Sequence, residues 1–138
     1  MDFDVARFSN VLVKSMADAV IYADANGRIR FWNDGAVRIF GFAEAEALGE
    51  SLDIIIPENL RRRHWDGFEK TMRTGESHYE AGAVLAVPAF RKDRTKISVE
   101  FTIVLFHDET GQRAGIAAVM RDVTKQFEEI RTLRKLVG

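Results

Sequence analysis

The spacing of apolar residues changes period along this chain of 138 residues, and the order of those changes limits the fold that it can adopt. Apolar residues recur every three to four positions in residues 4–18, which predicts a helix. Residues 19–32 hold two short apolar runs on either side of Asp24-Ala25-Asn26-Gly27, and Asn-Gly between such runs is typical of a β-hairpin. The fold is therefore expected to begin with a helix and a hairpin.

The helical period returns after the hairpin, in three pieces. Asn33 offers an N-cap for the first helix, and Gly41 ends it. A second short helix fits residues 43–48. The third and longest runs from Pro57 to Thr74, because proline suits the first turn of a helix and Gly75 suits the position just past its end.

Strand patterns fill most of the remaining chain. We expect strands at Tyr79–Phe90, Lys96–Phe106 and Gly115–Met120, the last of them an inner strand because it is apolar on both faces. Pro88 predicts an edge strand or a bulge. Thr124 is expected to cap a final helix.

Five strands, with helices grouped between the second and the third, predict an α+β fold in which helices cover one face of an antiparallel sheet. A hollow between the longest central helix and the sheet is the natural place for a ligand. Tyr22, Trp32, Trp65 and Tyr79 are candidates for its walls or for hydrogen bonds into it, although such tryptophans more often pack at the edge of a core.

Composition excludes several classes of protein. The chain has no cysteine, which removes disulfides, thiolate catalysis and cysteine-ligated metals. Its formal net charge is -1, so it lacks the basic excess of a general nucleic-acid or membrane-surface binder. No secretory signal or apolar run long enough to span a bilayer is visible, and a cytoplasmic protein is expected.

Motifs of enzymes are missing from the sequence. It contains no Gly-x-Ser-x-Gly, no glycine-rich phosphate loop and no His-Glu-x-x-His. His64 and His78 alone make a poor zinc pair. We therefore expect a protein that is not an enzyme.

His64 is the most informative residue of the longest central helix. It shares an apolar stripe with Leu60, Phe68 and Met72, each four residues from the next, and charged residues occupy the other sides. A neutral imidazole facing an apolar hollow can serve as an axial ligand of haem iron. A histidine at such a position is also often a core residue bonded to a backbone carbonyl, and that alternative stays open.

Seven segments carry a resemblance to a known family. They are Asp18–Ile21, Asp24–Ile29, Phe31–Ala36, Ile39–Phe42, Glu46–Gly49, Ile55–Pro57 and Met120–Thr124. In this order the chain resembles a PAS domain, a sensory and interaction module of which some members bind haem, flavin or small metabolites. The resemblance implies a flanking helix at 1–17, the PAS domain at 18–123 and a signalling helix at 124–138.

Residues 56–64 are similar to the segment of oxygen-sensing haem PAS domains in which a histidine seven residues after a proline binds the iron. The resemblance implies haem b with His64 as axial ligand, and Lys70 and His78 near its propionates. Residues 82–87 lack the arginine or methionine of those sensors, which favours CO or NO over O2 as the bound gas. The other expected lining residues are Leu60, Phe68, Met72, Val84, Leu85, Ile103 and Met120.

The terminal helices predict a homodimer. Phe127, Ile130, Leu133 and Val137 share one side of the last helix, and the first helix has its own apolar stripe. The alternative is that both helices fold back on their own sheet. Two functions stay open at this point: a ligand-binding sensor, or a cofactor-free module for dimerisation and signal relay. Either is expected to act on an output domain or a separate signalling partner.

Overall fold

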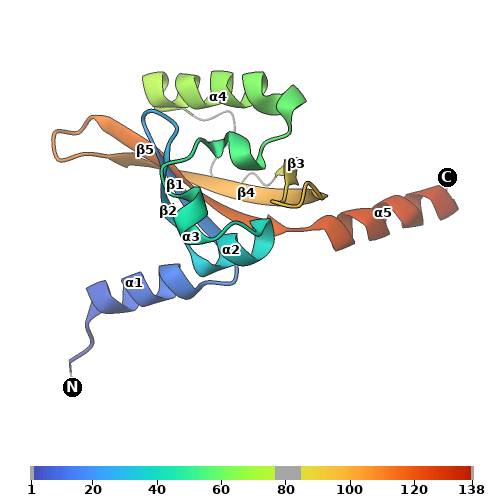
Figure 1. The fold of residues 1–138 in the computed structure, drawn as a ribbon, viewed down its shortest axis with the longest axis horizontal. Coiled ribbons are helices and arrows are strands. Elements are labelled where there is room, and N and C mark those ends of the chain that lie inside the picture. The colour runs from blue at the N-terminus through green and yellow to red at the C-terminus, as the bar shows by residue number, and fades with distance from the viewer. Residues whose placement is uncertain (1, 77–84, 138) are drawn as a thin grey trace.

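The fold is that of a computed structural model, which describes residues 2–76 and 85–137. Within these residues a five-stranded antiparallel sheet has the order β2-β1-β5-β4-β3 (Figure 1). Its strands are β1 (Ala19–Asp24), β2 (Ile29–Trp32), β3 (Leu85–Phe90), β4 (Lys96–His107) and β5 (Arg113–Asp122). The order confirms that β5 is an inner strand and that β3, which contains Pro88, lies at an edge.

The helices lie close to the ranges that the apolar spacing predicted, and two of their starts differ. They are α1 (Val5–Ser15), α2 (Asp34–Phe40), α3 (Glu44–Ala47), α4 (Arg61–Thr74) and α5 (Thr124–Val137), with 3-10 turns η1 (Leu52–Ile55) and η2 (Glu58–Leu60). Figure 1 shows α1 and α5 extending away from the body that the sheet forms with α2, α3 and α4. The predicted α+β architecture with two flanking helices is confirmed.

One face of the sheet forms the core. The register aligns Ile21 of β1, Ala118 of β5 and Ile103 of β4 on that face, and α2, α3 and η1 pack against it. The buried residues of this core are Ala19, Ile21, Ala23, Ile29, Trp32, Ala36, Ile39, Phe40, Ala47, Leu52, Ile55, Ala89, Ile97 and Val99. The core is therefore concentrated under α2, α3 and η1.

The opposite face of the sheet presents apolar side chains to solvent. Tyr22, Ala117 and Val104 align there, and the Tyr22 ring meets the Phe106 ring edge-on at 5.6 Å. Val104 and Phe106 remain 52% and 48% exposed. Tyr22 therefore points away from the ligand hollow that the sequence suggested for it, because its neighbour Ile21 occupies the core face.

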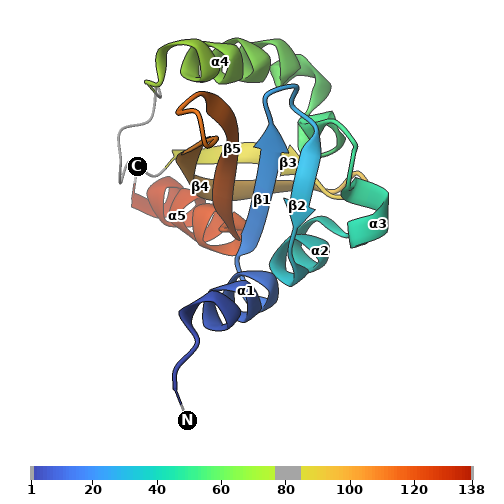
Figure 2. The ribbon, with the colours of Figure 1, turned by 90° about the vertical axis from the view of Figure 1, so that its left-hand side faces the viewer.

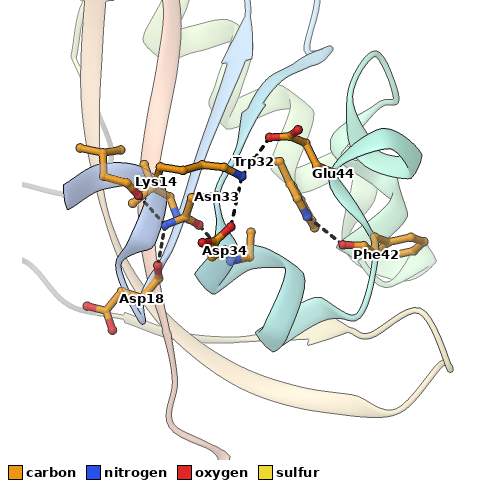
Figure 3. Close-up of polar contacts among 10 residues, drawn as sticks. Lys14, Asp18, Trp32, Asn33, Asp34, Phe42 and Glu44 are labelled. Atoms are coloured by element: carbon orange, nitrogen blue, oxygen red, sulfur yellow. Dashed lines mark hydrogen bonds and ion pairs between the residues drawn. The ribbon is translucent and has the colours of Figure 1, made fainter. Parts of the chain in front are cut away.

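Asn33 joins α1, β1 and α2, as Figure 3 shows. Its Oδ1 accepts hydrogen bonds from the backbone N–H groups of Val20, at 2.8 Å, and Ala36, at 2.9 Å. Its Nδ2 donates to the carbonyl oxygens of Val13, at 2.9 Å, and Asp18, at 3.0 Å. The side chain is fully buried, so the predicted N-cap of α2 also fixes where α1 leaves the domain.

Two expected helix starts differ from those observed. An α-helix was expected from Pro57, but Pro57 precedes the 3-10 turn η2 and α4 begins at Arg61. The Arg61 side chain donates to the carbonyl oxygens of Ile56 and Asp53, which ties the turn to the segment before it. Arg61 is therefore half-buried, whereas Arg62 and Arg63 are exposed.

The start of α5 is the second difference. The backbone N–H of Thr124 donates to Asp122 Oδ1 at 2.9 Å, and its hydroxyl donates to the same oxygen at 2.6 Å. That hydroxyl also accepts from the backbone N–H of Ser98 in β4. Thr124 therefore ties α5 to the sheet, whereas the carboxylate of Asp122 binds the first N–H of the helix.

None of the helices in the described ranges combines the length and the apolar character needed to cross a membrane.

Candidate functional site

The stripe on α4 is half-buried along its whole length. Leu60, His64, Phe68 and Met72 all have intermediate exposure, and Thr71 is the one residue of α4 that is buried. Phe68 packs at the margin of the core. The face of α4 that carries His64 is therefore less closely packed than the face of α2 that covers the same sheet.

His64 lies among aromatic rings, and one of its nitrogens has no hydrogen-bond partner among residues 2–76 and 85–137. Its ring centroid is 4.6 Å from that of Trp65 and 6.2 Å from that of Phe68. Nδ1 is buried and makes no hydrogen bond within the described part of the chain. A buried polar atom left in this way costs about 1–3 kcal/mol, so its retention points to a ligand or to a role beyond packing.

The surroundings of His64 favour its uncharged form. Burial lowers the pKa of the imidazole below its ordinary value of 6.5, and the negative charge of Asp53 opposes this effect only in part. A neutral imidazole keeps one nitrogen lone pair free of a proton, which is the form that binds metals.

Trp65 fastens the first half of α4 to the rest of the fold. Its Nε1 donates to Asp53 Oδ1 at 2.7 Å, and its ring lies directly over Gly27 in the turn between β1 and β2. Figure 2 shows α4 lying over this turn. A Cβ on residue 27 would fall 2.4 Å from the ring, so the glycine of the hairpin turn is also required by the close approach of Trp65.

Arg113 of β5 holds the other end of α4. It donates to the carbonyl oxygen of Arg73 at 3.0 Å, and its guanidinium lies against Gly75, which caps the helix in the left-handed conformation. A cation at the C-terminal end of α4 also interacts favourably with the helix dipole. The helix that carries His64 is thus anchored at both ends, while its middle is only half-buried.

The remaining predicted lining residues divide into two groups. Ile103 and Met120 lie on the core face of the sheet and are half-buried, and Met120 packs at the margin of the core. Leu85 pairs with Phe101 through β3, but its side chain lies outside the described residues, as do Val84, His78 and Tyr79. Lys70, expected near a propionate, is exposed.

Trp32 is a core residue and not a wall of the site. It is fully buried, and its Nε1 donates to the carbonyl oxygen of Phe42 at 3.0 Å. Sequence reasoning missed the roles of Asp53 and Arg113, because no local pattern links either of them to α4.

Acidification is expected to destabilise the ligand-free protein through His64. Because the folded state lowers the pKa of His64, the unfolded chain takes up this proton at a higher pH than the folded protein does. The free energy of unfolding should therefore fall as the pH is lowered through about 6.5. Urea unfolding across this range should show a shallower pH dependence for His64→Gln, and parallel profiles would contradict the assignment.

No group of three or more His, Asp or Glu side chains within residues 2–76 and 85–137 could hold a metal ion. A single axial histidine is a different kind of site, in which a porphyrin supplies the other ligands.

Comparison with known proteins identifies the family. The family model described as the PAS fold matches residues 8–123. This chain is a PAS domain. The order of its elements, which predicted that family, is confirmed by solved structures. A PAS domain from Colwellia psychrerythraea superposes with a TM-score of 0.77 at 19% identity, covering 88% of this chain and 99% of that one.

The curated relatives of this PAS domain include sensor proteins. Sensor protein FixL of Bradyrhizobium diazoefficiens is 28% identical over 91% of this chain, and oxygen sensor protein DosP of Escherichia coli is 25% identical over 94%. The chain spans only 24% and 16% of their lengths. An RNA-binding light-oxygen-voltage receptor has the same fold, with a TM-score of 0.78 at 18% identity, covering 96% of this chain and 37% of that one.

Proposed function

We propose that this PAS domain senses a gas or a redox change through haem b, held between α4 and the sheet with His64 as axial ligand. The observation that carries the proposal is the imidazole itself, which is anchored on α4, kept uncharged by burial and left with a buried nitrogen that has no partner among the described residues. The similarity to an oxygen sensor protein supports the same class of signal.

The residues present fit haem. His64 offers a neutral nitrogen donor, and Leu60, Phe68 and Met72 extend an apolar, half-buried surface on both sides of it along α4. Ile103 and Met120 lie on the core face of the sheet. When bound, haem supplies an iron centre that takes up a gas or an electron. The chain's own part is to hold the imidazole and to exclude water around it.

Removing the imidazole tests the proposal. His64→Ala should weaken haem binding at least about tenfold and shift the Soret band of the reconstituted protein, because the axial nitrogen is lost. His107→Ala is the matched control, since His107 is exposed at the end of β4. Absorption spectra of the three reconstituted proteins are compared after circular dichroism has shown that each is folded. An unchanged Soret band in His64→Ala would overturn the assignment.

The terminal helices favour a second function, as a module for dimerisation and signal relay. No residue of α1 or α5 is buried. Phe8, Val11 and Leu12 of α1, and Ile130 of α5, each expose about half of their surface or more. A second copy of the chain would remove these apolar stripes from water by pairing them.

The purified chain is therefore expected to be a homodimer. Leu12→Glu should shift it toward monomer, because a carboxylate on the apolar stripe of α1 opposes burial. Asn10→Glu, on the other side of the same helix, should leave the dimer intact. Light scattering at several concentrations measures the change. A parent chain that stays monomeric throughout would count against the interface.

A further inference from the structure

A polar hollow lies apart from α4, where both flanking helices join the domain. Its volume is about 290 Å³. The polar residues that line it are Asp18 between α1 and β1, Arg38 of α2, Arg91 after β3, and Arg121 and Asp122 at the end of β5. We infer that this hollow binds a small carboxylate or phosphate anion.

The two carboxylates of the hollow are already engaged. Asp122 accepts both hydrogen bonds from Thr124 at the start of α5. Asp18 accepts from the guanidinium of Arg121 at 3.4 Å, and Arg121 also lies 3.9 Å from Glu100. No ion pair within the described ranges joins either carboxylate to Arg38 or Arg91, so the three arginines and two aspartates of the lining leave it with a net charge of +1.

Arg38 and Arg91 keep donors for a ligand. Arg38 binds the carbonyl oxygen of Ala17, which uses only one of its two terminal nitrogens. The half-buried side chain of Arg91 makes no hydrogen bond or ion pair within the described ranges. Its positive charge has only a longer-range electrostatic interaction with the carboxylate of Asp93. A partly desolvated guanidinium without an anion is a costly arrangement that an added anion would relieve.

The shape and chemistry of the hollow limit the ligand. A planar guanidinium offers paired N–H donors that match the oxygens of a carboxylate or a phosphate. A volume of about 290 Å³ is at the lower end for ligand pockets, which suits a small anion rather than a nucleotide. Arg38 in α2, Arg91 in the loop after β3 and Arg121 in β5 come from three separate segments, so an anion bound by all three would cross-link those segments.

The hollow lies beside the connections of both flanking helices, so anion binding there would affect how these helices are attached. Asp18 follows α1 directly and Asp122 precedes α5 directly. An anion bound to Arg121 competes with Asp18 for that guanidinium, and so changes how the α1 connection is held against the end of β5. This inference is independent of any ligand bound near His64.

Titration of the full chain tests the site. Inorganic phosphate and malonate are added separately at constant ionic strength, and backbone amide shifts are followed by nuclear magnetic resonance. We expect saturable shifts at Ala17, Arg91 and Asp122 with at least one of the two anions. Arg91→Gln should weaken binding about tenfold, since it removes charge-assisted hydrogen bonds. Arg62→Gln, on the exposed side of α4, should leave it unchanged.

The comparison of the two anions also shows which chemical group the hollow binds. Saturation with phosphate alone assigns the site to phosphate groups, and saturation with malonate alone assigns it to carboxylates. Linear, unsaturable shifts with both anions would overturn the inference. Equal weakening in Arg91→Gln and Arg62→Gln would also overturn it, because that result reports overall charge and not a site.

Discussion

Replacing Asn33 by alanine is expected to lower the free energy of unfolding by about 3–5 kcal/mol. The change removes an N-cap and strands four backbone groups at once: the N–H groups of Val20 and Ala36 and the carbonyl oxygens of Val13 and Asp18. Because Asn33 is fully buried, water cannot replace those hydrogen bonds without opening the structure.

Urea unfolding of the parent and of Asn33→Ala measures this loss. Asn33→Ser should recover about 1 kcal/mol of it, because a serine hydroxyl can still cap α2 but cannot reach all four groups. Asn59→Ala is the control, since Asn59 is exposed in η2 and a change there should be within about 0.5 kcal/mol of the parent. A loss below 1 kcal/mol in Asn33→Ala would contradict the role of this residue as a junction.

Gly35→Ala is expected to destabilise the domain by about 3 kcal/mol or more. A Cβ at this position would lie 2.0 Å from the carbonyl oxygen of Asp18 and 2.6 Å from that of Ala17. Both are backbone atoms, and Asn33 and Arg38 hold the same two carbonyl groups in place. The segment therefore has little freedom to move aside, and α2 would have to shift instead.

The matched control for Gly35→Ala should change stability in the opposite direction. Gly67 is exposed within α4, and a Cβ there would meet no atom within 4 Å. Gly67→Ala should raise the free energy of unfolding by about 0.5–1 kcal/mol, because alanine favours a helix more than glycine does. Similar effects of the two substitutions would mean that close packing at Gly35 does not decide its identity.

Local patterns were sufficient for most of the fold. The Asn-Gly turn, the Asn33 and Gly41 caps and the alternation along β4 each depend on residues close in sequence, and all were predicted. The predicted start of α4 was wrong because a 3-10 turn and an α-helix have nearly the same apolar spacing over three residues. The prediction that Tyr22 faces the ligand hollow was wrong for a different reason. Alternation assigns the residues of β1 to two faces of the sheet but does not indicate which face the helices cover.

The candidate site was predicted only in part. Helical spacing put Leu60, His64 and Phe68 on one stripe, and the structure places them on one half-buried face. The contacts that hold this stripe come from other elements, through Asp53 and Arg113, and no spacing within α4 indicates them. The polar hollow could not be predicted either, because its arginines are far apart in the sequence and only the folded structure brings them together.

The two ends of β5 have unequal partners, and this has a mechanical consequence. Arg113, the first residue of β5, donates a hydrogen bond to the end of α4. Asp122, the last residue of β5, accepts a hydrogen bond from the first turn of α5. Paired on both sides by β1 and β4, the strand resists stretching. We therefore expect a displacement of the end of α4 to be transmitted along β5 to the start of α5 without unfolding of the sheet.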